Sequence, residues 1–331
     1  PAEANYVPAA QLDAFLRQSR SAVLAEIHYG EAPGDRAETL HPRVAVGMRQ
    51  LADPLVEVWT SALPVEYRRA GEVRFACNRE ILFGCLSFAQ PGSGRFETTI
   101  RERYSEILDL LKAEGYPHLL RMWNYFPGIH VALGALDRYQ CFCRGRYEAL
   151  ERFYNSFGGG FEQVLPSASA VGGQTGDFVL YFLAAREPGR PRENPRQVSA
   201  YHYPPQYGPK SPSFARATLK HWADADYLYI SGTASIVGHE SRHVADPAVQ
   251  LEETLRNLEA LIDSTAAEEG CRFRGLESIT HLKAYVREPA HFPLVRQRLD
   301  GLFGSEVARF YFQGEICRPD LLLEIEAIVR A

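Results

Sequence analysis

The sequence has no apolar run long enough to cross a bilayer and no excess of positive charge. No stretch approaches about 18 uninterrupted apolar residues, and the N-terminal segment lacks the apolar core of a secretory signal. The formal net charge is −5, so the chain has no general basic surface for nucleic acid. We therefore expect a cytoplasmic protein whose partner is neither a membrane nor a nucleic acid.

Cysteine pairs and nucleotide-binding motifs are also missing. The six cysteines form no C-x-x-C pair, and Cys141 and Cys143 stand two apart in a segment expected to be helical, which places them on different faces. We expect reduced thiols, with no disulfide and no cysteine metal site. No G-x-G-x-x-G, G-x-S-x-G or phosphate loop occurs, which argues against a dinucleotide site and a hydrolase elbow.

The composition is that of a globular protein with a core, and the two halves of the chain resemble each other. Apolar residues make up 46% of the 331 residues and charged residues 23%, and the length suggests about two domains. The segment "TGDFVLYFLAAR" (175–186) aligns with "RPDLLLEIEAIVR" (318–330), and 97–115 aligns with 252–270, both ending in glycine. Such self-similarity indicates a duplicated unit.

Each half shows strand, helix, strand, helix and two further strands. Asp246 and Pro247 predict the start of the first helix of the second half, and 307–317 and 321–329 are expected to pair across a turn at 318–320. The fold class is therefore α/β (α+β), with two tandem mixed sheets that each carry helices on one face. We expect an N-terminal domain over 1–187, a Pro- and Gly-rich linker over 188–198, and a C-terminal domain over 199–331.

Two carboxylates interrupt the apolar last strand. Leu321, Leu323, Ile325 and Ala327 are expected to point toward the helices, and Leu322, Glu324 and Glu326 toward the other half of the molecule. Tyr181 takes the place of Glu324 in the first half, so only one copy has the acid. Glu326 is interpreted as structural or at the rim of a site.

Four segments resemble the chorismatase family: "HLLRMWNYFPGI" (118–129), "NPRQVSAYHYPPQYGPKSPSFARATL" (194–219), "LYISGTASIVGHE" (228–240) and "GEICRPDLLLEIEA" (314–327). The second half is also similar to the reactive-intermediate deaminase (YjgF-like) family. The resemblance implies two such units in one chain with the active site between them. It implies cleavage of chorismate to pyruvate without a metal or an organic cofactor. We expect a monomer, because a duplicated chain can bury its interface internally.

The resemblance also implies site residues. Glu324 is the expected catalytic acid, and a carboxyl flanked by leucines suits that role because burial raises its pKa. Chorismate has two carboxylates, which favours arginines as anchors. The candidates for substrate contacts are Arg138, Arg298, Arg309, Arg216, Tyr201 and Tyr203. Gly232 and Cys317 resemble the hydroxybenzoate-forming branch, in which 3-hydroxybenzoate is the favoured product and 4-hydroxybenzoate the second.

Other readings stay open. The chain could hydrolyse chorismate to a dihydroxycyclohexadienoate plus pyruvate, or act as an imine deaminase or small-molecule binding protein of the YjgF-like family. "HESRH" (239–243) fits the H-E-x-x-H zinc signature. That chemistry needs both histidines on one helical face, whereas this motif follows a strand and precedes the helix start at Asp246 too closely. We expect a loop there and no metal.

Overall fold

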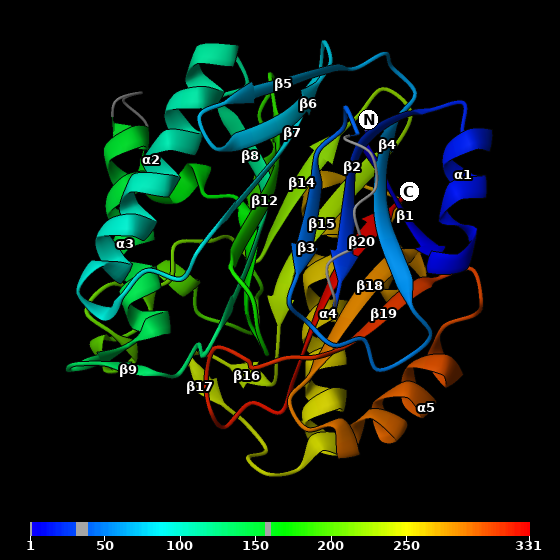
Figure 1. Ribbon diagram of the computed structural model, residues 1–331. Coiled ribbons are helices and arrows are strands. Elements are labelled where there is room, and N and C mark those ends of the chain that lie inside the picture. The colour runs from blue at the N-terminus through cyan, green and yellow to red at the C-terminus, as the bar shows by residue number, and fades with distance from the viewer. Residues whose placement is uncertain (1, 31–38, 156–159) are drawn as a thin grey trace.

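The structure contains three large β-sheets built from successive parts of the chain (Figure 1). It is a computed structural model that describes residues 2–30, 39–155 and 160–331. The first sheet has the strand order β1-β4-β2-β3. Its elements are β1 (Ala2–Pro8), α1 (Leu12–Gln18), β2 (Ala22–Tyr29), β3 (Arg43–Val46) and β4 (Leu55–Ser61).

The second and third sheets have six strands each, in the orders β11-β8-β12-β7-β6-β5 and β13-β14-β15-β20-β18-β19. The second comprises β5 (Glu66–Ala70), β6 (Val73–Cys77), β7 (Ile81–Phe88), α2 (Phe96–Glu114), β8 (His118–Pro127), α3 (Arg138–Asn155), β11 (Ser167–Gly173) and β12 (Phe178–Ala185). The third comprises β13 (Arg190–Arg192), β14 (Ala217–His221), β15 (Asp226–Thr233), α4 (Pro247–Glu269), β18 (Ile279–Val286), α5 (Phe292–Leu302), β19 (Ala308–Gln313) and β20 (Leu323–Arg330). Two small pairs, β9 (Ala132–Leu133) with β10 (Leu136–Asp137) and β16 (Ile236–Val237) with β17 (Glu240–Ser241), lie beside them.

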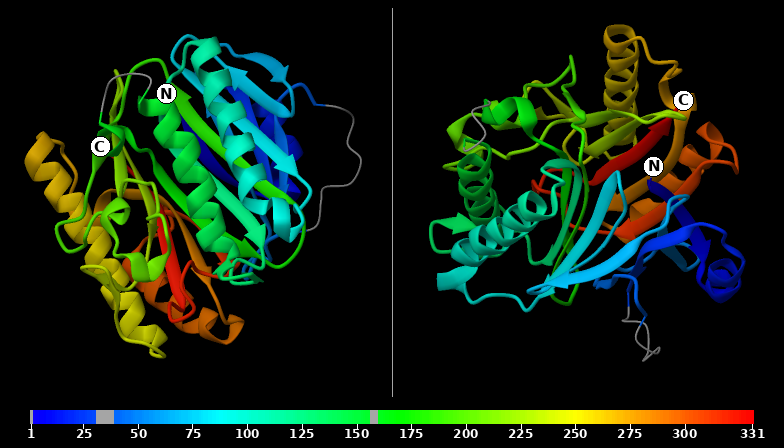
Figure 2. Two further views of the ribbon diagram at one scale, coloured as in Figure 1. Left: turned by 90° about the vertical axis from the view of Figure 1, so that its left-hand side faces the viewer. Right: turned by 90° about the horizontal axis from the view of Figure 1, so that it is seen from above.

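The second and third sheets repeat one topology. The order β6-β7-β12-β8-β11 corresponds to β14-β15-β20-β18-β19. The strands β8 and β11 are parallel, as are β18 and β19, and β12 and β20 run antiparallel to both of their neighbours. The helices α2 and α3 cover one face of the second sheet, and α4 and α5 cover one face of the third (Figure 2). The predicted tandem fold is confirmed, and the first sheet is an addition that the repeat did not predict.

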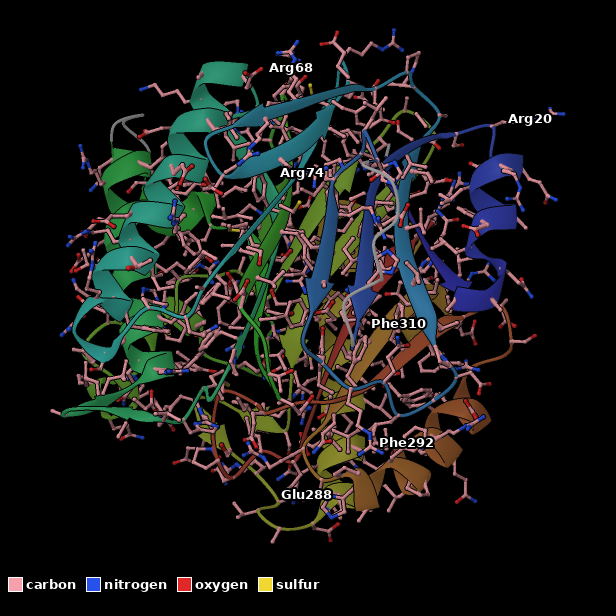
Figure 3. All side chains as sticks on the ribbon, viewed as in Figure 1. Arg20, Arg68, Arg74, Glu288, Phe292 and Phe310 are labelled. Atoms are coloured by element: carbon pink, nitrogen blue, oxygen red, sulfur yellow. The ribbon has the colours of Figure 1, made fainter. Side chains whose placement is uncertain are left out.

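The sheet faces turned away from the helices pack together. Their side chains form a central cluster with members from all three sheets. Trp59 of β4, Tyr181 of β12 and Phe310 of β19 all belong to it, and side chains fill the space between the sheets (Figure 3). The interior of the molecule is therefore the junction of three sheets, with the helices outside.

β20 occupies the centre of the third sheet, between β15 and β18. The predicted pairing of the last two strands is wrong: α5 carries the chain to the far side of β18, where β19 pairs in parallel, and β20 returns to the gap beside β15. The predicted alternation is confirmed for Leu323 and Ile325, which pack under the helices, and for Glu326, which contacts the second sheet. Leu321 precedes the strand and packs in the central cluster instead.

The connections between elements follow local signals in part. α4 starts where predicted, since Asp246 accepts a hydrogen bond from the N–H of Val249 and Pro247 opens the helix. The segment 188–198 is packed rather than free: β13 pairs with β14, and the buried Asn194 donates to the carbonyl of Asn257 at 2.8 Å. The domain limits stay a prediction. Among the helices of the described residues, none combines the length and the apolar character that crossing a membrane requires.

Candidate active site

A pocket lies where the second and third sheets meet, and we call this boundary the seam. A parallel bridge between Ser167 of β11 and Ala215 joins the two sides. The pocket is lined by the start of α3 and the turn before it, by β11, by the segment 203–216, by β15, by the turn 317–319 and by β20. Both halves of one chain therefore contribute walls to the same pocket.

Glu324 lies at the inner end of this pocket. It stands on β20 opposite Tyr285 of β18, and only 4% of it is exposed. Burial raises the pKa of its carboxyl to about 8; the charge of Glu326 adds to the rise, whereas Arg121 and Arg216 oppose it. The carboxyl consequently holds its proton at neutral pH.

Gly232 of β15 leaves the space that the Glu324 carboxyl occupies. A Cβ atom at position 232 would lie 2.0 Å from Oε1 of Glu324, which is far inside van der Waals contact. The N–H of Gly232 donates across the seam to Oγ of Ser169 at 3.0 Å. A side chain at position 232 would therefore force the Glu324 carboxyl to move from this position.

Three arginines line the pocket with N–H groups that lack a hydrogen-bond partner among the described residues. Arg216 donates through Nη2 to the hydroxyl of Tyr203 at 2.7 Å, and its Nε has no partner. Arg318 donates through Nη1 to the carbonyl of His239 at 2.8 Å, and its Nη2 has none. In Arg146, both Nε and Nη2 lack partners. Buried donors without acceptors are costly, so these groups suit an anionic ligand.

Cys317 reaches the pocket from the turn before β20. Burial raises the pKa of its thiol to about 12, and the charge of Glu324 adds to the rise, while Arg318 and Arg216 oppose it. The thiol is therefore protonated at neutral pH, and it acts on a ligand through its size and its weak polarity rather than as a thiolate.

The structure brings five of the nine predicted site residues together around the pocket: Tyr203, Arg216, Gly232, Cys317 and Glu324. The roles given to them stay predictions. The pocket also has lining residues that were not predicted, among them Arg146, Arg318, Ser169, Tyr139, Tyr207 and Gln206. A signal for Arg146 exists in the sequence, because it shares a helical stripe with the buried Phe142 and Phe153. The available signal for Arg318 is its position directly after Cys317, a predicted site residue.

Arg138 does not line the pocket, although its neighbours Asp137 and Tyr139 do. Its Nη1 donates to the carbonyl of Pro127 at 2.7 Å, and its guanidinium lies 5.6 Å from the ring centroid of Phe96. Arg138 opens α3, and successive positions of a helix face different directions. The predicted substrate contact is therefore not supported by its position.

Arg298, Arg309 and Tyr201 also lie away from the pocket lining. Arg298 lies on the same side of α5 as Leu294, which is 37% exposed, whereas the buried residues of this helix are Val295 and Leu299. Arg298 is therefore on the outer side of the helix. Arg298 pairs with Glu252 at 2.6 Å. Arg309, on the edge strand β19, donates to the carbonyl of Gly304 at 2.8 Å, and Tyr201 packs against the core beneath α2 and α3.

The H-E-x-x-H segment does not form a zinc helix. It includes the short strand β17, and His243 has a φ of 58°. Nδ1 of His239 lies 3.3 Å from the hydroxyl of Tyr207, whereas Nε2 of His243 lies 3.3 Å from Glu253, so the two rings have separate partners. Elsewhere in the described residues, one group of three possible metal ligands lies close together, outside the pocket: His221, Asp226 and Cys271.

A family model, two relatives and a solved structure match this chain. Residues 57–184 match the family model described as "Chorismatase FkbO/Hyg5-like, N-terminal". The chain is 35% identical to a 3-hydroxybenzoate synthase of Streptomyces hygroscopicus over 87% of this chain and 86% of the relative. It is 36% identical to a chorismatase of Streptomyces rapamycinicus over 87% and 86%. A crystal structure of a chorismatase matches with a TM-score of 0.88 at 32% identity, covering 99% of this chain and 98% of that one.

The raised pKa of Glu324 predicts a pH-dependent stability difference for Glu324→Gln. The pKa of this carboxyl rises from 4.5 to about 8 on folding. Its contribution to stability is therefore full below pH 4.5 and is lost as the pH rises toward 8. Glutamine keeps the shape without the charge, so the variant should gain thermal stability over the unsubstituted protein as the pH rises. Thermal unfolding of both between pH 5 and 8.5 measures this, and a pH-independent difference would contradict it.

Proposed function

The chain belongs to the chorismatase family, and from this premise we propose that it cleaves chorismate to pyruvate and a hydroxybenzoate with Glu324 as the catalytic acid. One observation carries the proposal: a buried carboxyl with its pKa raised to about 8 borders a pocket at the seam. A general acid must hold its proton at the working pH and must be able to give it up in the transition state. Glu324 meets the first requirement because of its burial.

The chemistry requires such an acid. The side chain of chorismate is a vinyl ether, and protonation of its terminal methylene carbon produces an oxocarbenium ion from which pyruvate is released. Pyruvate and hydroxybenzoate together contain the atoms of chorismate, so this route consumes no water. Hydrolysis to a dihydroxycyclohexadienoate adds one water molecule. Both routes begin with the proton of Glu324, and both should slow as the pH rises past the pKa of that carboxyl.

The arginines of the pocket suit the two carboxylates of this substrate. We assign the anchoring role to Arg146, Arg216 and Arg318, because all three line the pocket and each keeps at least one N–H group without a partner among the described residues. Carboxylates accept such donors in strong, charge-assisted hydrogen bonds. Two anchors at fixed positions would hold the vinyl ether in one orientation relative to Glu324.

The favoured product is 3-hydroxybenzoate, with 4-hydroxybenzoate as a second. Gly232 lies against the Glu324 carboxyl, and Cys317 lines the pocket beside it. The name of one relative, 3-hydroxybenzoate synthase, supports the assignment. We propose that the thiol of Cys317 fills the space a water molecule would need beside the ring. The ring hydroxyl of chorismate would then attack the neighbouring carbon that carries the ether oxygen. That carbon–oxygen bond breaks, and pyruvate leaves with the ether oxygen as its carbonyl oxygen. Loss of a ring proton would complete the aromatic product before water adds.

We further propose that a single chain is the functional unit, because both walls of the pocket come from one chain. The resemblance to chorismatases implies neither metal nor organic cofactor. The cytoplasmic location stays a prediction from the thiol content; all six cysteines are unpaired.

Replacing the acid should abolish the reaction. Glu324→Gln is expected to lower the rate of pyruvate release from chorismate by about 100- to 10,000-fold, the usual contribution of a general acid. A lactate-dehydrogenase-coupled assay measures pyruvate directly. Glu315→Gln is the matched control, since Glu315 lies in the preceding turn and pairs with Arg287, and it should keep near-normal turnover. Substantial turnover by Glu324→Gln would remove the mechanism.

Two arginines of the same helix should differ. Arg146→Met is expected to raise KM for chorismate by about tenfold or more, because a hydrogen bond to a charged group contributes about 1.5–3 kcal/mol. Arg138→Met, two turns away on α3, should leave KM unchanged. Steady-state kinetics of both variants decide between the structural assignment and the one made from sequence; the reverse pattern would favour Arg138.

Chromatography shows whether the enzyme forms hydroxybenzoate or dihydroxycyclohexadienoate. Cys317→Ala removes the thiol and should increase the share of dihydroxycyclohexadienoate relative to hydroxybenzoate, while pyruvate release continues. The products of the unsubstituted enzyme and of the variant are separated and compared after complete conversion. An unchanged product ratio would exclude Cys317 as the residue that keeps water out.

A further inference from the structure

We propose that Glu326 is a positioning residue. It forms ion pairs with the buried cations of the seam and so keeps the neighbouring Glu324 uncharged and in place. The inference rests on the proposed function of Glu324. Glu324 and Glu326 stand on the same face of β20, about 7 Å apart along the strand, and each is only 4% exposed. Two carboxylates so close in a buried seam need different electrostatic surroundings if one is to stay neutral.

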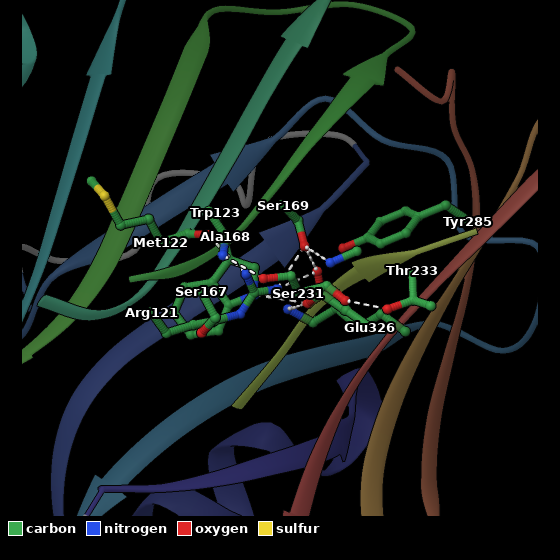
Figure 4. Close-up of polar contacts among 12 residues, drawn as sticks. Arg121, Met122, Trp123, Ser167, Ala168, Ser169, Ser231, Thr233, Tyr285 and Glu326 are labelled. Carbon is green, nitrogen blue, oxygen red and sulfur yellow. Dashed lines mark hydrogen bonds and ion pairs between the residues drawn. The ribbon is translucent and has the colours of Figure 1, made fainter. Parts of the chain in front are cut away.

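Glu326 has a complete set of partners, all from other strands. Its carboxylate accepts hydrogen bonds from Nη2 of Arg121 at 2.8 Å, Nε1 of Trp123 at 2.7 Å and Oγ of Ser169 at 2.5 Å (Figure 4). Nζ of Lys283 lies 3.3 Å from its Oε1. These partners lower the pKa of Glu326 despite the burial that opposes them. Glu326 is therefore the ionised member of the pair. Of the two roles expected for it, structural or at the rim of a site, its burial and its partners favour the structural one.

The charges of this cluster balance without Glu324. Lys283 also lies 2.9 Å from Oε2 of Glu57, which is as buried as the lysine. Two cations, Arg121 and Lys283, thus match two carboxylates, Glu326 and Glu57. None of the ion pairs formed by these groups includes Glu324. An ionised Glu324 would add a third negative charge with no cation left for it, which the low dielectric of the seam penalises.

Ser169 links this charge balance to the position of the Glu324 carboxyl. Its Oγ donates to Glu326 and accepts from Nη2 of Arg121 at 2.6 Å and from the N–H of Gly232 at 3.0 Å. Gly232 is the residue whose missing Cβ makes room for Glu324. The same hydroxyl therefore holds Glu326 in its ion pairs and holds β15 at the distance that the acid requires.

Several other ionisable groups act on Glu324 or line the pocket beside it. They are Arg121 from β8, Arg216 before β14, Tyr285 from β18, Asp137 from β10, Tyr139, Cys143 and Arg146 from α3, Tyr203 and Tyr207 from the segment 203–216, and Cys317 and Arg318 before β20. Burial raises the pKa values of Tyr139, Tyr285, Cys143 and Cys317, so these four groups are neutral near pH 7. Arg216 is a remaining cation that opposes the neutral state, and a substrate carboxylate bound to it would offset its charge.

The test is the pH profile of kcat/KM for chorismate in Glu326→Gln. Removing the charge leaves Arg121 and Lys283 with one positive charge in excess, so Glu324 should ionise more readily. The alkaline limb of the profile is expected to move down by about one pH unit or more. The rate at pH 8 should then fall about fivefold or more beyond any change on the acid plateau. Glu57→Gln also removes one negative charge, on the far side of Lys283 from Glu326. It should move the alkaline limb in the same direction but by less.

Ser169→Ala provides the neutral control, because it removes a hydrogen bond and no charge: the rate should fall at every pH with the limb unmoved. Thermal unfolding checks that each variant folds, and Glu57→Gln carries the test if Glu326→Gln does not. An equal loss at every pH in Glu326→Gln and no shift in Glu57→Gln would overturn the proposal.

Difference infrared spectroscopy against Glu324→Gln separates this proposal from the proposed function. The band of a protonated carboxyl that disappears in Glu324→Gln reports the proton of Glu324 without any substrate. It should titrate at lower pH in Glu326→Gln than in the unsubstituted protein. If the unsubstituted protein releases no pyruvate from chorismate, the proposed function fails, whereas the infrared titration still decides whether Glu326 sets the charge of Glu324. An unmoved band would refute the positioning role.

Discussion

The structure depends on a constraint at the seam: a carboxyl must be buried there without its charge. A sheet that carries helices on one face buries its other face against another layer, and here three sheets meet in this way. In most such interfaces the buried side chains are apolar, and the central cluster here combines aliphatic and aromatic side chains. Burial of Glu324 in this boundary raises its pKa to about 8, and the charge of Glu326 adds to the rise. Gly232 leaves the space that the carboxyl occupies.

The two mixed sheets repeat one topology, but only one of them has the acid of the pocket. The same register shift occurs between β12 and β8 and between β20 and β18. Matching these shifts places Tyr181, opposite Trp123, at the position of Glu326, opposite Lys283. The predicted equivalence of Tyr181 and Glu324 is therefore wrong by two residues. The hydroxyl of Tyr181 donates to Glu57 and accepts from Lys283 at 2.9 Å, so Tyr181 and Glu326 both belong to the charge cluster of the seam, whereas Glu324 borders the pocket.

Features that depend on near neighbours in the chain are the ones that the sequence predicts. The repeat, the alternation along the last strand and the cap at Asp246 follow from periodicity and capping, which depend on near neighbours. The pocket arginines do not follow from local rules. Arg298 lies between Leu294 and Leu302 on one side of α5, but both leucines are exposed, so this side faces solvent. Arg146 is the buried one, and its stripe of aromatic neighbours on α3 was the available signal.

By itself, the sequence determined the two mixed α/β units, the strand that carries the carboxylates and the family to which its motifs point. Only the tertiary structure decided that β20 lies between β15 and β18, that the first sheet joins the core, and that Arg146 and Arg318 rather than Arg138 and Arg298 line the pocket. The physical reason is that periodicity fixes which face of an element a residue occupies, whereas the partner of that face is set by packing between segments far apart in the chain. The difference between Glu324 and Glu326 belongs to the second kind, because residues up to 205 positions away supply the cations and donors that ionise one and leave the other neutral.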